Sequence, residues 1–121
     1  MNDVINDRNK FKKLFSNTTS RSLLGVWLMA KGSRYPIKAL AEIVSIPEDA
    51  LEAKFQTFAG MGLVHVISDS RGDRQVEFLP SPTPDLEKMI WELFDGRKSE
   101  YDAVELKMRA LTYKTLMTTT L

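Results

Sequence analysis

The spacing of the apolar residues changes abruptly at Gly60 and Gly62. Between residues 37 and 58 the apolar residues recur every three or four positions, which is the period of an amphipathic helix. Residues 64–67 and 75–79 instead read as strands, and a polar loop that contains a glycine separates them. Glycine favours helix ends because it adopts positive φ without strain. The chain is therefore predicted to combine helices with a hairpin, in a mainly helical α+β fold.

Helical spacing is also present on both sides of this central part of the chain. Helices are predicted at residues 4–16, about 21–30, 36–44, from 47 to the glycines, 85–94 and about 99–117. Residues 32–36 are predicted to form a turn, and the three prolines of residues 80–84 a stiff extended connector. Trp27 and Trp91 lie on apolar helix faces, so we expect both in the core. The connector divides the chain into residues 1–84 and the C-terminal helices of residues 85–121.

Positive charge is concentrated at the N-terminal end of the chain. Residues 1–38 carry eight basic and two acidic side chains, a net of +6, whereas residues 39–63 carry one basic and four acidic, a net of −3. A basic segment can neutralise phosphates and release their counterions, which is the sequence-independent part of DNA affinity. The alternative is a lysine-rich first helix that is simply well solvated.

Catalysis finds little support in the composition. The chain has no cysteine and a single histidine, His65, which we expect to be structural at the start of a strand. The acidic residues are not spaced as metal ligands, and Gly60 and Gly62 end a helix, whereas a phosphate-binding loop would open one. We therefore expect no enzyme activity, no metal and no cofactor. The absence of a secretory signal and of a long apolar run favours a cytoplasmic protein that does not enter a membrane.

The segment KALAEIVSIPEDALEAKFQTFAGMGLVHVIS, residues 38–68, resembles a winged helix-turn-helix, and the wider resemblance covers residues 22–79. Ala41 occupies the small-residue position of the first motif helix. Leu51, Phe55 and Phe58 take the inward positions of the recognition helix, and the chain then leads into the first strand of the wing. The segment is similar to small bacterial or phage transcription regulators and to the N-terminal winged helix of replisome organisers. The resemblance implies a two-stranded wing, flanking N- and C-terminal helices and a DNA-binding function.

Contacts to duplex DNA are expected from three parts of the chain. Lys54 and Gln56 would lie on the outer face of the recognition helix, and two arginines would lie in the hairpin. Cations before and beside the motif would hold phosphates. The candidate DNA-binding residues are Lys54, Gln56, Arg71, Arg74, Arg34, Lys38 and Arg21.

Acidic residues at the start of the recognition helix complicate this expectation. Glu48, Asp49 and Glu52 would repel phosphate, although a carboxylate can accept a hydrogen bond from cytosine N4. Acids at a helix N-terminus also stabilise the helix without any ligand, because they complement its dipole. Two functions therefore stay open. The first is a DNA-binding regulator, with transcription favoured over replication. The second is a protein-interaction module or replication-associated adaptor, whose acidic face would meet a basic partner.

The last predicted helix carries an apolar stripe formed by Tyr101, Val104, Met108 and Leu111. This stripe could pack on the chain's own first helix, at Phe11, Leu14 and Phe15, or on a second copy of the chain. Winged-helix regulators with this layout commonly dimerise through terminal helices, which matches a two-fold symmetric DNA site. The sequence therefore favours a homodimer over a monomer with an enlarged core.

Overall fold

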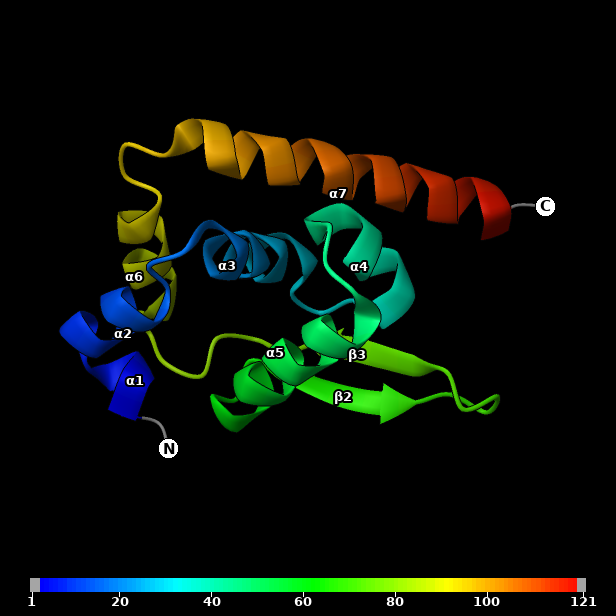
Figure 1. The fold of residues 1–121 in the computed structure, drawn as a ribbon, viewed down its shortest axis with the longest axis horizontal. Coiled ribbons are helices and arrows are strands. Elements are labelled where there is room, and N and C mark those ends of the chain that lie inside the picture. The colour runs from blue at the N-terminus through cyan, green and yellow to red at the C-terminus, as the bar shows by residue number, and fades with distance from the viewer. Residues whose placement is uncertain (1–2, 120–121) are drawn as a thin grey trace.

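The fold is a mainly helical α+β structure, as predicted (Figure 1). The computed structural model describes the backbone of residues 3–119 and the side chains of residues 5–114. In chain order the elements are α1 (Asp3–Asn6), α2 (Arg8–Leu14), α3 (Thr18–Ala30), β1 (Arg34–Pro36), α4 (Ile37–Val44), α5 (Glu48–Gly60), β2 (Val64–Ser68), β3 (Arg74–Phe78), α6 (Leu86–Leu93) and α7 (Lys98–Thr119).

Capping side chains set several of the helix boundaries. The first predicted helix is divided into α1 and α2, because Asp7 Oδ1 accepts two backbone N–H groups from the first turn of α2, at 3.0 and 3.1 Å. Asn17 caps α3 in the same way and accepts from the backbone N–H of Ser20 at 2.8 Å, so α3 begins before its predicted start. Ser45 ends α4 with a left-handed backbone, φ 58°.

The sheet has three antiparallel strands in the order β1–β3–β2. The predicted hairpin of β2 and β3 is confirmed, but β1 lies where a turn was predicted. Two backbone hydrogen bonds hold the start of β1: Gly32 N–H donates to Phe78 O at 2.8 Å, and Phe78 N–H donates to Ser33 O at 2.9 Å. A strand of three residues is too short to show a period. Pro36 is tolerated because β1 is an edge strand, where alternate backbone N–H groups point to solvent and the missing N–H of proline costs no hydrogen bond of the sheet.

The core lies between the sheet and helices α3, α4 and α5. Phe55 of α5 is fully buried, with its ring centroid 6.0 Å from Phe58 and 5.9 Å from Phe78. Trp27 of α3 is also fully buried, and its Nε1–H donates to the Leu63 carbonyl oxygen at 3.0 Å. These positions confirm the predicted inward face of α5 and the core position of Trp27. The same expectation for Trp91 is wrong, since this side chain is 47% exposed.

Helix α7 runs along one edge of the molecule and crosses α3 and α4 (Figure 1). Its inner stripe, which we define as Tyr101, Val104, Met108 and Leu111, faces these helices. Val104 and Met108 are buried, and the other two are partly buried against the same core. The stripe therefore packs on α3 and α4 within the chain. The two buried side chains are not available to a second copy, so the structure corrects their assignment to a dimer interface and makes the C-terminal helices an extension of the core.

Gly25 lies where α3 meets α7. A Cβ atom at this position would lie 3.4 Å from Phe94 Cζ, 3.8 Å from Tyr101 Cδ1 and 3.8 Å from Val104 Cγ1, which are ordinary contact distances. We expect Gly25→Ala to be neutral or to stabilise the fold by up to about 1 kcal/mol, because alanine favours the helix. We expect Gly25→Leu to destabilise it by about 1–3 kcal/mol, since the larger side chain must push α7 away. Urea unfolding measures both, and equal stabilities for the two variants would contradict this packing.

Candidate nucleic-acid interface

Helix α5 is the centre of the candidate interface. With Leu51, Phe55 and Phe58 buried, the opposite side of the helix faces solvent. Gln56 is exposed, whereas Lys54 is half-buried and lies toward α2 and α3. The exposed residues around them are small or uncharged: Ala50, Ala53 and Thr57. A helix face of this kind can approach another surface closely, because few long side chains stand in the way.

The acids at the start of α5 fall into two groups. Glu48 and Asp49 are exposed in the first turn, next to the positive end of the helix dipole, and within residues 5–114 neither forms an ion pair. Glu52, one turn later, is paired with Arg74 at the start of β3: its two carboxylate oxygens lie 3.2 Å from Nε and 3.4 Å from Nη2. The repulsion expected from Glu52 is therefore offset by a cation of the same chain.

The same contact fixes Arg74. Besides Glu52, its guanidinium donates through Nη1 to Ser68 Oγ at 2.9 Å, on the neighbouring strand. Arg74 thus lies at the base of the hairpin beside α5, and its 42% exposed side chain is paired with a carboxylate of the same chain. Its role as a DNA contact stays a prediction.

The hairpin tip is an ordered turn built on Asp69. Asp69 Oδ1 accepts from the backbone N–H of Arg71 at 2.8 Å and of Asp73 at 2.9 Å. Gly72 supplies the positive φ of 85° that closes the turn. The Arg71 side chain is exposed, and its guanidinium forms no hydrogen bond or ion pair with another described side chain. Of the two predicted hairpin arginines, Arg71 is the one free to meet an anion.

Helix α2 brings further cations to the other end of α5. Phe15, which ends α2, lies with its ring centroid 5.8 Å from Phe58 of α5. Lys10 and Lys13 are exposed on α2. Lys54 lines a small cavity of about 130 Å³ between α2, α3 and α5. In Figure 1, α5 therefore lies between the basic helix α2 and the hairpin tip.

Arg34 and Lys38 come from β1 and α4. Arg34 on β1 is 54% exposed, and its Nη2 lies 3.5 Å from Glu77 Oε2. Glu77 also contacts His65 Nδ1 at 3.3 Å, because the three residues are directly opposite one another across β1, β3 and β2. Lys38 is exposed on α4. The structure thus links the hairpin to α5 through Arg74 and Glu52, and pairs Arg34 with Glu77. Among the described side chains, no hydrogen bond or ion pair joins Lys54, Gln56, Arg71 and Lys38 to one another.

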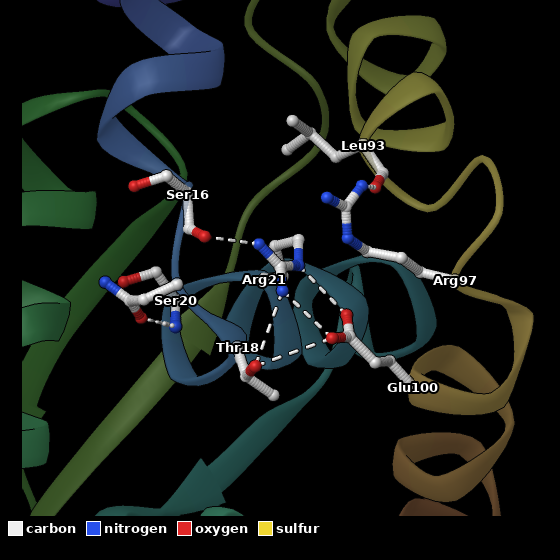
Figure 2. A network of polar contacts seen from close by, with 8 residues as sticks. Ser16, Thr18, Ser20, Arg21, Leu93, Arg97 and Glu100 are labelled. Carbon is white, nitrogen blue, oxygen red and sulfur yellow. Dashed lines mark hydrogen bonds and ion pairs between the residues drawn. The ribbon is translucent and has the colours of Figure 1, made fainter.

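Arg21 is not a surface cation, which corrects its assignment as a phosphate contact (Figure 2). Its side chain is 8% exposed and forms a two-point pair with Glu100 of α7, through Nε at 2.9 Å and Nη2 at 2.9 Å. Nη1 donates to the Ser16 carbonyl oxygen at 2.6 Å, and Nη2 lies 3.4 Å from Thr18 Oγ1. Glu100 was not singled out in the sequence because nothing local to it indicates a partner 79 residues away.

The hydrogen bonds of this pair hold the pKa of the Glu100 carboxyl below its ordinary value, since Arg21 favours the charged form. They raise the pKa of Arg21 for the same reason, against the opposing effect of burial. The pair therefore stays ionised and fastens α7 to the start of α3. Its role is structural.

Other kinds of site find no support in the part of the chain that the structure describes. Residues 5–114 contain no group of three or more His, Asp or Glu side chains that could hold a metal ion. Across the described helices, none combines the length and hydrophobicity needed to cross a membrane. Searches of protein families, curated proteins and solved structures found no match to this chain.

Proposed function

We propose that this chain is a winged-helix protein that binds duplex DNA, with α5 as the recognition helix and the β2–β3 hairpin as the wing. Support comes from the element order α3–β1–α4–α5–β2–β3, in which β1 pairs with β3 to close a small antiparallel sheet. The observation that carries the proposal is the Glu52–Arg74 contact. This contact places the hairpin beside α5, and Arg74 neutralises the negative charge of Glu52.

Each part of this surface has a distinct role in the proposal. Lys54 and Gln56 reach base edges in the major groove, where amide and ammonium groups discriminate between bases. Arg71 contacts a phosphate beside the groove, and Lys10 and Lys13 contact phosphates at the other end of α5. Because most of these cations meet the backbone, the larger share of the affinity is independent of sequence.

A small transcription regulator is the biological role that the resemblance of residues 38–68 implies. Such proteins act on two-fold symmetric sites as dimers. One observation favours a second function, a protein-interaction module: Glu48 and Asp49 are exposed, and no cation of the described chain is paired with them. In that case the acidic first turn of α5 would contact a basic protein.

Fluorescence anisotropy of the full chain with a labelled random duplex of about 30 base pairs tests DNA binding across several salt concentrations. We expect the affinity to fall steeply with salt. Arg71→Ala should weaken binding several-fold and reduce the slope of log affinity against log salt by about 1, the value for one lost phosphate contact. Lys98→Ala is the matched control, because Lys98 is an exposed cation on α7, far along the chain from α5, and should leave binding unchanged.

A double substitution of Glu48→Gln with Asp49→Asn separates the two functions. If α5 meets DNA, removing the two charges reduces repulsion and tightens binding. DNA binding that is absent at low salt, or that is equally strong in the Arg71→Ala and Lys98→Ala variants, would contradict the proposed interface and favour a protein partner at the acidic turn.

A further inference from the structure

A groove of about 810 Å³ lies where α6 meets the start of α7, and Lys12 of α2 also lines it (Figure 1). Three aromatic rings pack together in this groove. The ring centroid of Tyr101 lies 4.8 Å from that of Trp91 and 5.4 Å from that of Phe94. Phe94 is buried, but Trp91 is 47% exposed. A large ring that is held by its neighbours and still open to solvent offers a surface on which a flat ligand can stack.

One side of α6 carries a cation, this exposed ring and a carboxylate in succession. Lys88, Trp91 and Asp95 follow one another at spacings of three and four, which places them in a row along α6 and the turn that ends it. Lys88 and Asp95 are both exposed, and neither has an ion-pair partner within residues 5–114. The groove is therefore polar along its length, with its aromatic part in the middle.

The part of the groove beside Lys88 is rich in cations. The hydrogen bond from Arg8 lowers the pKa of the Glu92 carboxyl against the opposing effect of burial, and the charges of Lys12 and Lys88 lower it further. Three cations therefore lie close to this one carboxylate, and Arg8, at 2.8 Å, is the one that pairs with it. Lys12 is exposed and forms no ion pair with another described side chain. Lys12 and Lys88 thus remain able to bind an anion.

The charged side chains that α7 contributes to the groove are already paired within the chain. Lys98 Nζ lies 2.9 Å from Asp102 Oδ2, and Arg109 Nη2 lies 3.6 Å from Glu105 Oε1. These two pairs add no net charge. The charge that a ligand meets is therefore set by the lysines at one end of the groove and by Asp95 at the other.

We propose that this groove binds single-stranded nucleic acid, with one unpaired base stacked on Trp91. Phosphates of the strand contact Lys12 and Lys88, and the amino group of the base donates to the Asp95 carboxylate. The order of cation, ring and carboxylate along α6 thus matches the order of phosphate, base and amino edge in a nucleotide. Proteins bind single strands through such a combination of backbone cations and aromatic stacking. A duplex covers both faces of each base, so it cannot use Trp91 in this way.

Fluorescence anisotropy of a labelled oligo(dC) of about 12 nucleotides with the full chain tests the proposal. Trp91→Ala should weaken binding by about 5- to 150-fold, the range for one lost base stack. Tyr113→Ala, which removes an aromatic side chain that is 67% exposed later in α7, is the matched control and should leave binding unchanged. Lys12→Ala with Lys88→Ala should reduce the slope of log affinity against log salt by about 1.4, the value for two phosphate contacts on a single strand.

Asp95 should make the groove selective for the base. Cytosine N4 donates a hydrogen bond to a carboxylate, whereas thymine presents the acceptor O4 at the same position. We therefore expect oligo(dC) to bind several-fold more tightly than oligo(dT). Asp95→Asn should reduce this preference, because an amide can also donate to thymine O4.

This groove and the α5 interface can be tested separately, because they share no residue. Trp91→Ala should weaken binding of the strand and not of the duplex, and Arg71→Ala the reverse. The double lysine variant changes only exposed side chains, so it tests the groove even if Trp91→Ala disturbs the packing against Tyr101. Strand binding that is absent at low salt, or unchanged in the double lysine variant, would overturn the proposal. Equally tight binding of dCMP, or tighter binding of an oligoarginine peptide, would overturn the assignment of the ligand as a strand.

Discussion

Replacement of Arg21 by methionine is expected to lower the free energy of unfolding by about 2 kcal/mol. The substitution keeps much of the apolar stem but leaves the Glu100 carboxylate and the Ser16 carbonyl oxygen without their shared donor. Loss of one partner from a fully buried ion pair costs about 3–5 kcal/mol, and the expected value is smaller because Glu100 is 23% exposed and water partly replaces the lost donor. Urea unfolding at neutral pH measures the difference.

Arg8→Met provides the control for this result. Arg8 Nε lies 2.8 Å from Glu92 Oε1, a distance similar to those of the Arg21 pair, but both side chains are far more exposed. Exposed ion pairs contribute little, because water screens the charges and both side chains lose freedom. We therefore expect the Arg8→Met variant to unfold close to the wild type. Equal destabilisation by the two substitutions would show that burial does not distinguish the pairs.

The Arg21 effect should also depend on pH. Arg21 lowers the pKa of Glu100 in the folded state, so the stability from the pair is fully present above the ordinary carboxyl pKa and is lost as pH falls through the lowered one. The difference between wild type and Arg21→Met should therefore shrink on acidification from about pH 7 to about pH 3. A difference that stays constant over this range would contradict the assignment of Glu100 as the ionised partner.

The parts of the fold that were predictable from the sequence depend on local patterns. Leu51, Phe55 and Phe58 lie on one face of a helix whatever it packs against, and the buried face of α5 was therefore evident from their spacing. Gly62 stopped this helix at the expected place, because its φ of 80° is costly for other residues. The hairpin was predictable because the spacing of the apolar residues changes from that of a helix to that of a strand after Gly62.

The parts that were not predictable depend on partners distant in the sequence. Strand β1 exists because β3 offers it backbone hydrogen bonds, and its three residues carry no pattern of their own. Arg21, Arg74 and Arg71 are all cations beside polar residues. Only the folded chain shows that Arg21 is buried in an ion pair with Glu100 and that Arg74 pairs with Glu52. Among the described residues, Arg71 has no such partner. The candidate interface therefore contains fewer cations than the sequence predicted, since Arg21 is buried in a structural ion pair.

Buried and exposed side chains of α7 should respond differently to truncation. Met108 is 3% exposed within the core, so Met108→Ala removes buried contacts and leaves a cavity. We expect a loss of about 2–4 kcal/mol in the free energy of unfolding, independent of protein concentration. Leu106→Ala should change the stability of the monomer by less than about 0.5 kcal/mol, because the side chain contacts mainly solvent there.

Urea unfolding of the two variants measures this difference. A destabilisation by Leu106→Ala as large as that by Met108→Ala would place Leu106 in the core, against its observed exposure of 71%.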